Sequence, residues 1–290
     1  MDDKQVTATL ATKDQVSGIS LGASHVAFIN GKDVQYLEIL PPSLPKLDRF
    51  AYTFKKPMSS PQLAFSSKVD KTVFPEMVEK IVTNFQYSMA LLKNGVVHIH
   101  PLTADFFEDR CQAITFPEPT ADGTSDFITC AALTQFFFVY GTASGKIVYY
   151  DLADLTLVKT TKHRTAIKKI FHQPLNGVLC LFVDDDDQAY VLSHIVETVL
   201  KVEQWNTNTT RVIWDMEQKG PAVLFLTYSD STLTPYVYHR KSLKGAHCSQ
   251  LSQTTSLPYG YKPFSLINGS SVVCQVIWSY LECWRESRLG

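Results

Sequence analysis

A glycine-lysine motif is the first place where this sequence could bind a phosphate. Residues 140–147 read YGTASGKI, in which Gly141 and Gly145 precede Lys146. A phosphate-binding loop needs four residues between its glycines, a Ser or Thr after the lysine, and a helix after the loop. Here three residues separate the glycines, Ile147 follows the lysine, and the run IVYYDL favours a strand. The motif therefore predicts a β-hairpin turn, with Gly145 at a positive φ that glycine adopts cheaply.

A serine motif at residues 18–22 could supply a nucleophile. GISLG matches the G-x-S-x-G elbow, in which a serine stands on a sharp turn between a strand and a helix. After Ser20 the chain continues as ASHVAFING, which favours a strand and a hairpin turn instead of a helix. We therefore expect Ser20 in a turn between strands, without a catalytic role.

Two groups of residues have the types that bind metal ions. Asp184 to Asp187 form the run DDDD, and His98 and His100 share one face of a predicted strand because alternate side chains point the same way. The acidic run lacks the glycine and distal glutamate of a calcium loop. The histidines lack a third ligand at a recognisable spacing. We interpret the acidic run as a solvated hairpin tip and the histidines as core or surface residues, and we assign no catalytic, cofactor-binding or metal-binding residue.

Composition limits the classes of partner and compartment. The 290 residues contain 27 Lys and Arg and 28 Asp and Glu, so a net charge of -1 gives no overall field for nucleic acid or anionic membrane. The N-terminus has no basic leader with an apolar core, and the most apolar run, FITCAALTQFFFVYG, is too short for a membrane helix. The cysteines form no C-x-x-C pair and favour a reducing compartment, most of them as small core residues. They are Cys111, Cys130, Cys180, Cys248, Cys274 and Cys283.

Hairpins recur along the whole chain. Apolar runs of five to eight residues flank turns centred near Gly31, Gly95, Ser144, Asp185 and Asp230. The last two separations, about 40 and 45 residues, match the period of four-stranded propeller blades. Shorter apolar runs between the hairpins, such as FITCAAL, AIKKIFHQP, TRVIWDM and KPFSLING, are predicted to begin each blade. The run PEMVEKIVTNF fits helical spacing about as well as strand spacing.

One stretch fits a WD-type repeat in detail. Gly145 stands at the turn, Tyr150 and Asp151 replace the usual Trp-Asp pair, and His163 precedes the next blade. By contrast, Trp214 and Asp215 lie in a strand that begins a blade and are not this signature. The chain is therefore predicted to be all-β, a WD40-like β-propeller of six to seven blades.

Four sequence blocks resemble a known family. YGTASGKI, KKIFHQPLNGV, the segment from VIWD to YVYHRKSLKGA, and KPFSLING followed by CQ are similar to the second β-propeller of the WD repeat-containing protein 19 family, a subunit of intraflagellar transport complex A. The resemblance predicts one propeller domain over residues 1–290, with clear blades at 127–275 and looser ones at 16–116. The C-terminal tail of the chain, residues 276–290, lacks the family's closing hairpin. We expect the ring to be incomplete without it, with unpaired backbone groups at an open sheet edge. The chain is therefore predicted to be less stable, and to self-associate more, than a chain that carries this hairpin.

The resemblance implies a non-enzymatic scaffold for retrograde ciliary transport and for the ciliary import of membrane proteins. Implied partners are other complex A subunits and ciliary membrane-protein cargo adaptors, without nucleic acid, cofactor or direct membrane insertion. The implied locations are the cilium, the ciliary base and the cytoplasm. Two alternatives stay open. One is a WD-type scaffold of a vesicle coat or ubiquitin ligase adaptor, and the other is a propeller enzyme with buried carboxylates of raised pKa in its channel.

Overall fold

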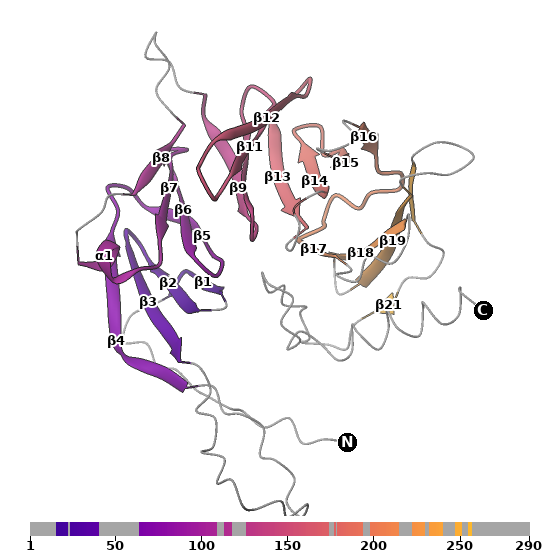
Figure 1. Ribbon diagram of the computed structural model, residues 1–290. Helices are drawn as coiled ribbons and strands as arrows, with labels where there is room; N and C mark the ends of the chain where they lie inside the picture. Colours follow the sequence, from indigo (N-terminus) through magenta and orange to yellow (C-terminus); the bar gives the residue numbers. More distant parts are fainter. Residues whose placement is uncertain are drawn as a thin grey trace, which may run out of the picture.

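Five antiparallel sheets stand side by side in an arc (Figure 1). The computed structural model describes residues 16–22, 24–40, 64–108, 113–117, 126–173, 177, 179–193, 198–214, 222–229, 232–239, 247–250 and 255–256. The first strands of the first four sheets contact one another in sequence, and the fourth and fifth sheets share a hydrophobic cluster, so the sheets are arranged as blades around an axis. This is the architecture of a β-propeller.

Each blade is a meander in which strands pair with their neighbours in sequence. Blade 1 contains β1 (Gly18–Leu21), β2 (His25–Asn30), β3 (Asp33–Leu40) and β4 (Ala64–Val73). Blade 2 contains β5 (Val78–Thr83), β6 (Tyr87–Leu92), β7 (Val97–Pro101) and β8 (Ile114–Phe116), with the short helix α1 (Ala104–Phe107) before β8. Blade 3 contains β9 (Ile128–Leu133), β10 (Phe137–Thr142), β11 (Lys146–Asp151) and β12 (Leu157–Lys162).

The last two described blades follow the same order. Blade 4 contains β13 (Ile167–His172), β14 (Leu179–Asp184), β15 (Ala189–Ser193) and β16 (Thr198–Lys201). Blade 5 contains β17 (Arg211–Trp214), β18 (Ala222–Ser229), β19 (Thr232–His239) and β20 (His247–Gln250), and β21 (Thr255–Ser256) also pairs with β19. Within the described residues no helix is long and apolar enough to cross a membrane.

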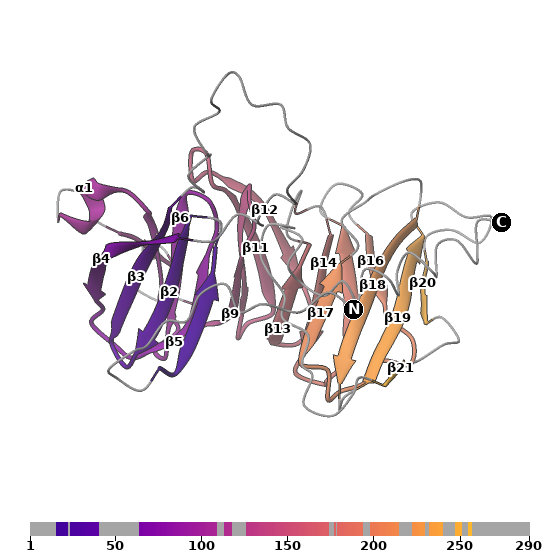
Figure 2. The same ribbon diagram turned by 90° about the horizontal axis from the view of Figure 1, so that it is seen from below.

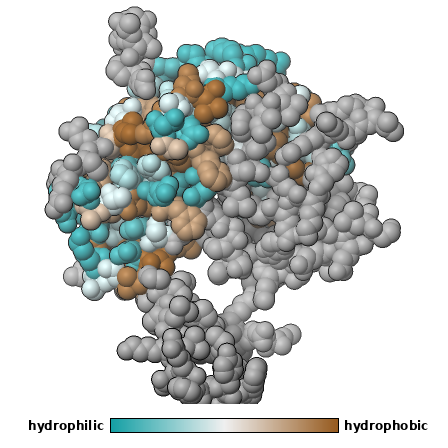
Figure 3. Space-filling view, in the orientation of Figure 1, coloured by the Kyte–Doolittle hydropathy of each residue, from teal (hydrophilic) through white to brown (hydrophobic). Residues whose placement is uncertain are grey.

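The meander gives each blade two ends. Turns from first to second strands and connections from third to fourth strands lie at one end, which also carries α1 and is named the α1 end (Figure 2). Turns between second and third strands lie at the opposite end. On the face seen in Figure 3, hydrophobic and hydrophilic side chains lie next to each other over the described blades.

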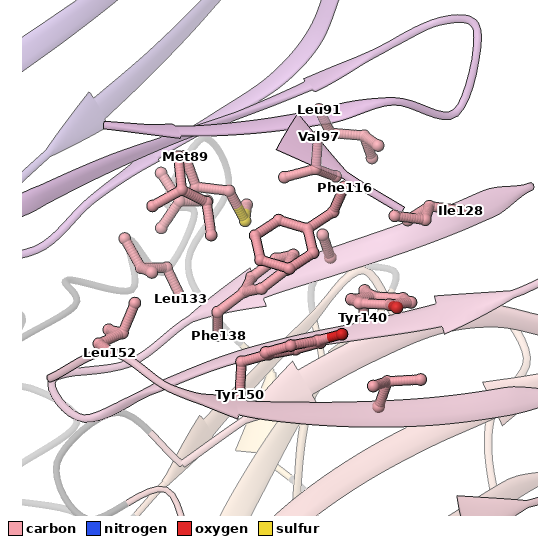
Figure 4. Packing of buried hydrophobic residues seen from close by; sticks show 14 residues of the cluster. Met89, Leu91, Val97, Phe116, Ile128, Leu133, Phe138, Tyr140, Tyr150 and Leu152 are labelled. Atoms are coloured by element: carbon pink, nitrogen blue, oxygen red, sulfur yellow. The ribbon is translucent and has the colours of Figure 1, made fainter. Parts of the chain in front are cut away.

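Hydrophobic clusters between consecutive blades form the core. The cluster between blades 2 and 3 interleaves side chains from both sheets (Figure 4). It includes Met89, Leu91, Val97, Ile99 and Phe116 from blade 2 and Ile128, Leu133, Phe138, Tyr140 and Tyr150 from blade 3. Strand alternation sends one set of side chains towards each neighbouring blade. Each blade is therefore stabilised by packing against the next.

The predicted hairpins are confirmed. Strand pairs β2–β3, β6–β7, β10–β11, β14–β15 and β18–β19 occupy the predicted segments. The turn residues 230–231, the run KPFSLING and the tail 276–290 lie outside the described residues. The propeller is confirmed, and five of its blades fall within the part of the chain that the structure describes.

The ambiguous run PEMVEKIVTNF contains a strand, β5, and its helical alternative is wrong. Val78 to Thr83 pair with β6, with a register shift between Val78 and Lys80. This shift explains the spacing: Val78 and Ile81 are both buried although they are three residues apart. A β-bulge of this kind breaks the two-residue alternation and makes a strand resemble a helix in sequence.

Gly145 is required by the turn between β10 and β11. Its φ is +87°, and an added Cβ would lie 2.5 Å from the Thr165 carbonyl oxygen and 2.7 Å from that of His163. Both are backbone atoms that cannot move aside as a flexible side chain can. We expect Gly145→Ala to lower the free energy of unfolding by about 2 to 3 kcal/mol, combining left-handed strain with this contact. Urea denaturation followed by circular dichroism measures it.

Gly31 provides the matched control. It has φ +66° in the turn between β2 and β3, but an added Cβ would meet the Met77 side chain at 3.7 Å, an ordinary contact. Gly31→Ala should therefore lower the free energy of unfolding through left-handed backbone strain alone, by about 1 kcal/mol. Equal losses for the two variants would show that the backbone contact at Gly145 contributes nothing.

Candidate functional site

Ser20 lies within strand β1, so the expectation of a turn is wrong. Its side chain is buried, its Oγ accepts the Thr83 N–H at 3.0 Å, and it lies 3.1 Å from Thr83 Oγ1. Thr83 ends β5 in the next blade. Ser20 therefore joins blades 1 and 2, and it is not exposed on an elbow as a nucleophile must be.

Further polar bonds join the first strands of later blades. Lys80 Nζ donates to the Ala131 carbonyl at 2.8 Å, from blade 2 to blade 3. Thr129 Oγ1 donates to the Ile167 carbonyl in blade 4. Sequence reasoning missed these bonds because each depends on two strands about 40 to 50 residues apart, a separation set by the blade period.

Asp184 is a buried structural residue, which corrects its assignment to a solvated tip. Its side chain is fully buried, its Oδ2 lies 2.9 Å from His163 Nε2, and its Oδ1 accepts the Gln188 N–H at 2.9 Å. Burial by itself raises the pKa of Asp184, but the bonds from His163 and Gln188 outweigh it, and the pKa lies below its ordinary value. The His163 ring also packs on Phe182 and Tyr190, with centroids 5.1 and 4.8 Å away.

The rest of the acidic run is at the surface, as predicted. Asp186 pairs with Arg164 at 3.3 Å and Asp187 pairs with Lys168 at 2.7 Å. Within the described ranges, no group of three His, Cys, Asp or Glu side chains could hold a metal ion. The run therefore fastens the tip of the β14–β15 hairpin to the residues around the start of β13.

His98 and His100 lie in β7, where His98 is partly exposed and His100 is buried. His100 is fully buried, stacks on Phe106 with ring centroids 3.9 Å apart, and meets Tyr36 edge-on at 5.5 Å. Neither ring nitrogen of His100 has a hydrogen-bond partner among the described residues. His98 Nδ1 lies 3.2 Å from Thr115 Oγ1. The interpretation of the two residues as core or surface histidines is confirmed, since His100 is buried and His98 is partly exposed.

Burial of His100 predicts acid sensitivity. Burial, with a smaller contribution from His98, lowers the pKa of His100 from 6.5 to about 3. Between these two pH values the unfolded chain binds a proton at His100 that the folded chain does not. The contribution of His100 to the free energy of unfolding is therefore complete above the unfolded pKa and decreases as the pH falls below it. From pH 7 to pH 5 we expect a loss of about 2 kcal/mol through this residue.

The variant His100→Phe isolates this effect, because it keeps an aromatic ring beside Phe106 and cannot titrate. The pKa values of His25 and His98 are also lowered by burial. The free energy of unfolding of the wild-type chain should therefore fall, from pH 7 to pH 5, by more than His100 alone accounts for. Urea denaturation at both pH values should therefore show a smaller acid loss in the variant, by about 2 kcal/mol. Equal losses would mean that His100 is not buried in its neutral form.

The three cysteines in the described part of the chain are free and buried, as predicted for core residues. They are Cys130, Cys180 and Cys248. Burial raises the pKa of the Cys130 thiol to about 11 and that of Cys248 to about 12. Thiols of this kind are poor nucleophiles because the thiolate is the reactive form.

The comparisons with known proteins agree with this architecture. The chain matches the family described as WDR19 second beta-propeller over residues 51–282, which is most of its length. The chain belongs to this family. The resemblance of the four sequence blocks is thereby confirmed.

The WDR19 relatives are much longer than this chain. Human WD repeat-containing protein 19 is 28% identical over 198 residues, covering 68% of this chain and 14% of the human protein. The Caenorhabditis elegans WD repeat-containing protein dyf-2 is 22% identical over 269 residues, covering 92% of this chain and 19% of that protein. The chain thus spans less than a fifth of either relative. Among solved structures, a chain of a mitotic checkpoint complex aligns with a TM-score of 0.48 and 13% identity, covering 87% of this chain and 70% of that chain.

In this WDR19-type propeller, one surface pocket of about 530 Å³ lies beside the connection between blades 4 and 5. Its lining includes Trp205, Lys201, Glu203 and Asp187. Asp187 is already paired with Lys168. The pocket combines opposite charges with an aromatic wall, a chemistry that fits contact with a polar or charged side chain.

Proposed function

We propose that this chain acts as a non-enzymatic scaffold of intraflagellar transport complex A. In this role it supports retrograde ciliary transport and the ciliary import of membrane proteins. The observation that carries the proposal is the match of residues 51–282 to the WDR19 second beta-propeller family. Its partners are other complex A subunits and ciliary membrane-protein cargo adaptors, and its locations are the cilium, the ciliary base and the cytoplasm.

The fold supports a docking role. Interleaved cores between blades and polar bonds between their first strands make a rigid body that holds its loops in fixed positions. Preorganised loops lose little entropy on binding, which favours affinity. The buried side chains of Ser20 and Asp184 have structural partners. We further propose that residues 1–290 form one propeller domain.

Affinity purification from ciliated cells tests this function. The tagged chain is expressed at a low level, and co-purifying proteins are quantified by mass spectrometry against cells expressing an unrelated tagged propeller. We expect specific enrichment of complex A subunits. Enrichment of vesicle-coat or ubiquitin-ligase subunits in place of complex A subunits would contradict the proposal. So would a failure to enrich complex A subunits when cooperative melting shows that the purified chain is folded.

A further inference from the structure

Two phenylalanines project into solvent at the α1 end of adjacent blades. Phe85 stands in the turn between β5 and β6 and is 53% exposed, and Phe136 stands in the turn between β9 and β10 and is 55% exposed. The two turns occupy corresponding positions in blades 2 and 3. Exposed aromatic side chains are enriched where proteins bind one another, because a ring contributes a large contact area at a small entropic cost.

Buried polar side chains fix the shape of both turns. Asn84 Oδ1 accepts the N–H groups of Gln86 at 2.8 Å and Tyr87 at 2.7 Å. Thr134 Oγ1 likewise accepts those of Phe136 at 3.2 Å and Phe137 at 2.8 Å. Asn84 and Thr134 are fully buried. Each exposed ring is therefore attached to a rigid backbone.

The turns are also joined to each other. Asn84 Nδ2 donates to the Thr134 carbonyl at 2.8 Å, which links the turns of blades 2 and 3. Ser24 Oγ donates to the Phe85 carbonyl at 3.0 Å and adds the corresponding turn of blade 1. The backbone positions from which the two rings project are thus set before any partner arrives, and preorganised anchors of this type bind with less loss of entropy.

Acidic residues lie in the loops that are bonded to the two turns. The connection after β7 bonds to the first turn through Leu102 N–H and the Gln86 carbonyl, 2.7 Å apart. The connection after β11 bonds to the second turn through Leu152 N–H and the Phe136 carbonyl, 2.8 Å apart. Residues 84–87, 102–108, 134–137 and 151–156, all described, include no Lys, Arg or His. They carry four acidic residues, Asp105, Glu108, Asp151 and Asp154, of which Glu108 also interacts with Lys68 on β4.

We propose that this surface, the Phe85–Phe136 surface, binds a protein segment that presents apolar side chains next to Lys or Arg. The rings would contact the apolar side chains, while the carboxylates attract the cations and repel polyanions such as nucleic acid or acidic lipid headgroups. The inference rests on the proposed docking function and adds its surface and the chemistry of its partner.

Selection from a random peptide library tests the surface directly. The purified 290-residue chain is immobilised and used to select phage-displayed peptides, and the recovered peptides are then measured by fluorescence anisotropy. We expect them to combine aromatic or aliphatic residues with Lys or Arg. Their affinity should fall at least about tenfold for Phe85→Ala/Phe136→Ala, the scale of an interface anchor, and should fall with added salt.

Two control variants separate the surface from general stickiness. Phe127 is 49% exposed at the opposite end, and Phe127→Ala should leave peptide binding unchanged. Asp105→Asn/Asp154→Asn should weaken the Lys- and Arg-containing peptides while the rings stay in place. Circular dichroism and melting temperature establish that all variants fold like the parent chain.

Several results would overturn the inference. These are failure to enrich any peptide, enrichment of acidic or uncharged peptides, or equal affinity of the selected peptides for Phe85→Ala/Phe136→Ala. The selection uses only the purified chain, so its result does not depend on whether complex A subunits co-purify from cells. The peptide selection can therefore contradict the proposed surface while the affinity purification supports the proposed function. The opposite combination of results can be recognised in the same way.

Discussion

Replacing Phe138 by alanine is expected to lower the free energy of unfolding by about 3 to 5 kcal/mol, the usual cost of truncating a buried phenylalanine. Phe138 is fully buried in β10. Its ring lies 4.9 Å from that of Phe116 in blade 2 and 5.4 Å from that of Tyr140 in its own blade. The cavity would open between two blades, each of which stabilises the other through this cluster. Equilibrium urea denaturation measures the loss.

Phe136→Ala is the matched control, because Phe136 is the same residue type two positions earlier. It is 55% exposed, so the substitution leaves no cavity and should change stability by less than about 0.5 kcal/mol. A similar loss for both variants would contradict the assignment of Phe138 to the core between blades. A small effect of Phe136→Ala on stability is also what the peptide-binding experiment requires.

The propeller could be predicted because its turns and strands leave local signals. Gly31, Gly95 and Gly145 all have positive φ, and each closes a hairpin between apolar runs. Such positions select glycine independently of the rest of the fold. The spacing between hairpins then reflects the length of a blade. These features depend on neighbours in sequence, so they can be read without a structure.

Irregular strand pairing and contacts between blades leave no comparable signal. The bulge in β5 shifts its pairing with β6 by one residue, so that Val78 and Ile81 both point inward and the apolar spacing imitates that of a helix. The exposure of Phe85 and Phe136 depends on which turns meet at the α1 end. An apolar residue in a turn can equally be buried beneath a loop, and only the assembled ring decides between the two.

Asp184 shows how a contact between segments overrides a local pattern. Four consecutive aspartates at a hairpin indicate a solvated turn, and this holds for Asp185 and Asp186, which are exposed. Asp184 ends β14 and faces His163, which lies 21 residues earlier, before β13 begins. Nothing in the acidic run itself distinguishes the first aspartate from the others.

This difference predicts a large effect at one aspartate and a small one at the next. Asp184→Ala would leave the Gln188 N–H and the His163 ring nitrogen without their buried acceptor. We expect the free energy of unfolding to fall by about 3 kcal/mol, since a buried polar group that loses its partner retains its desolvation penalty. Asp184→Asn keeps an acceptor oxygen and should cost less.

Asp185→Ala is the neighbouring control and should change stability by less than about 0.5 kcal/mol, as for an exposed residue. The pH dependence adds an independent check. Because the pKa of Asp184 lies below its ordinary value when folded, its contribution is present above the unfolded pKa of 3.8 and is lost as the pH falls through the folded pKa. The gap between wild type and Asp184→Ala should therefore narrow only in strong acid. A gap that already closes near neutral pH would show that the Asp184 carboxylate is not the group that holds His163 and the β14–β15 turn together.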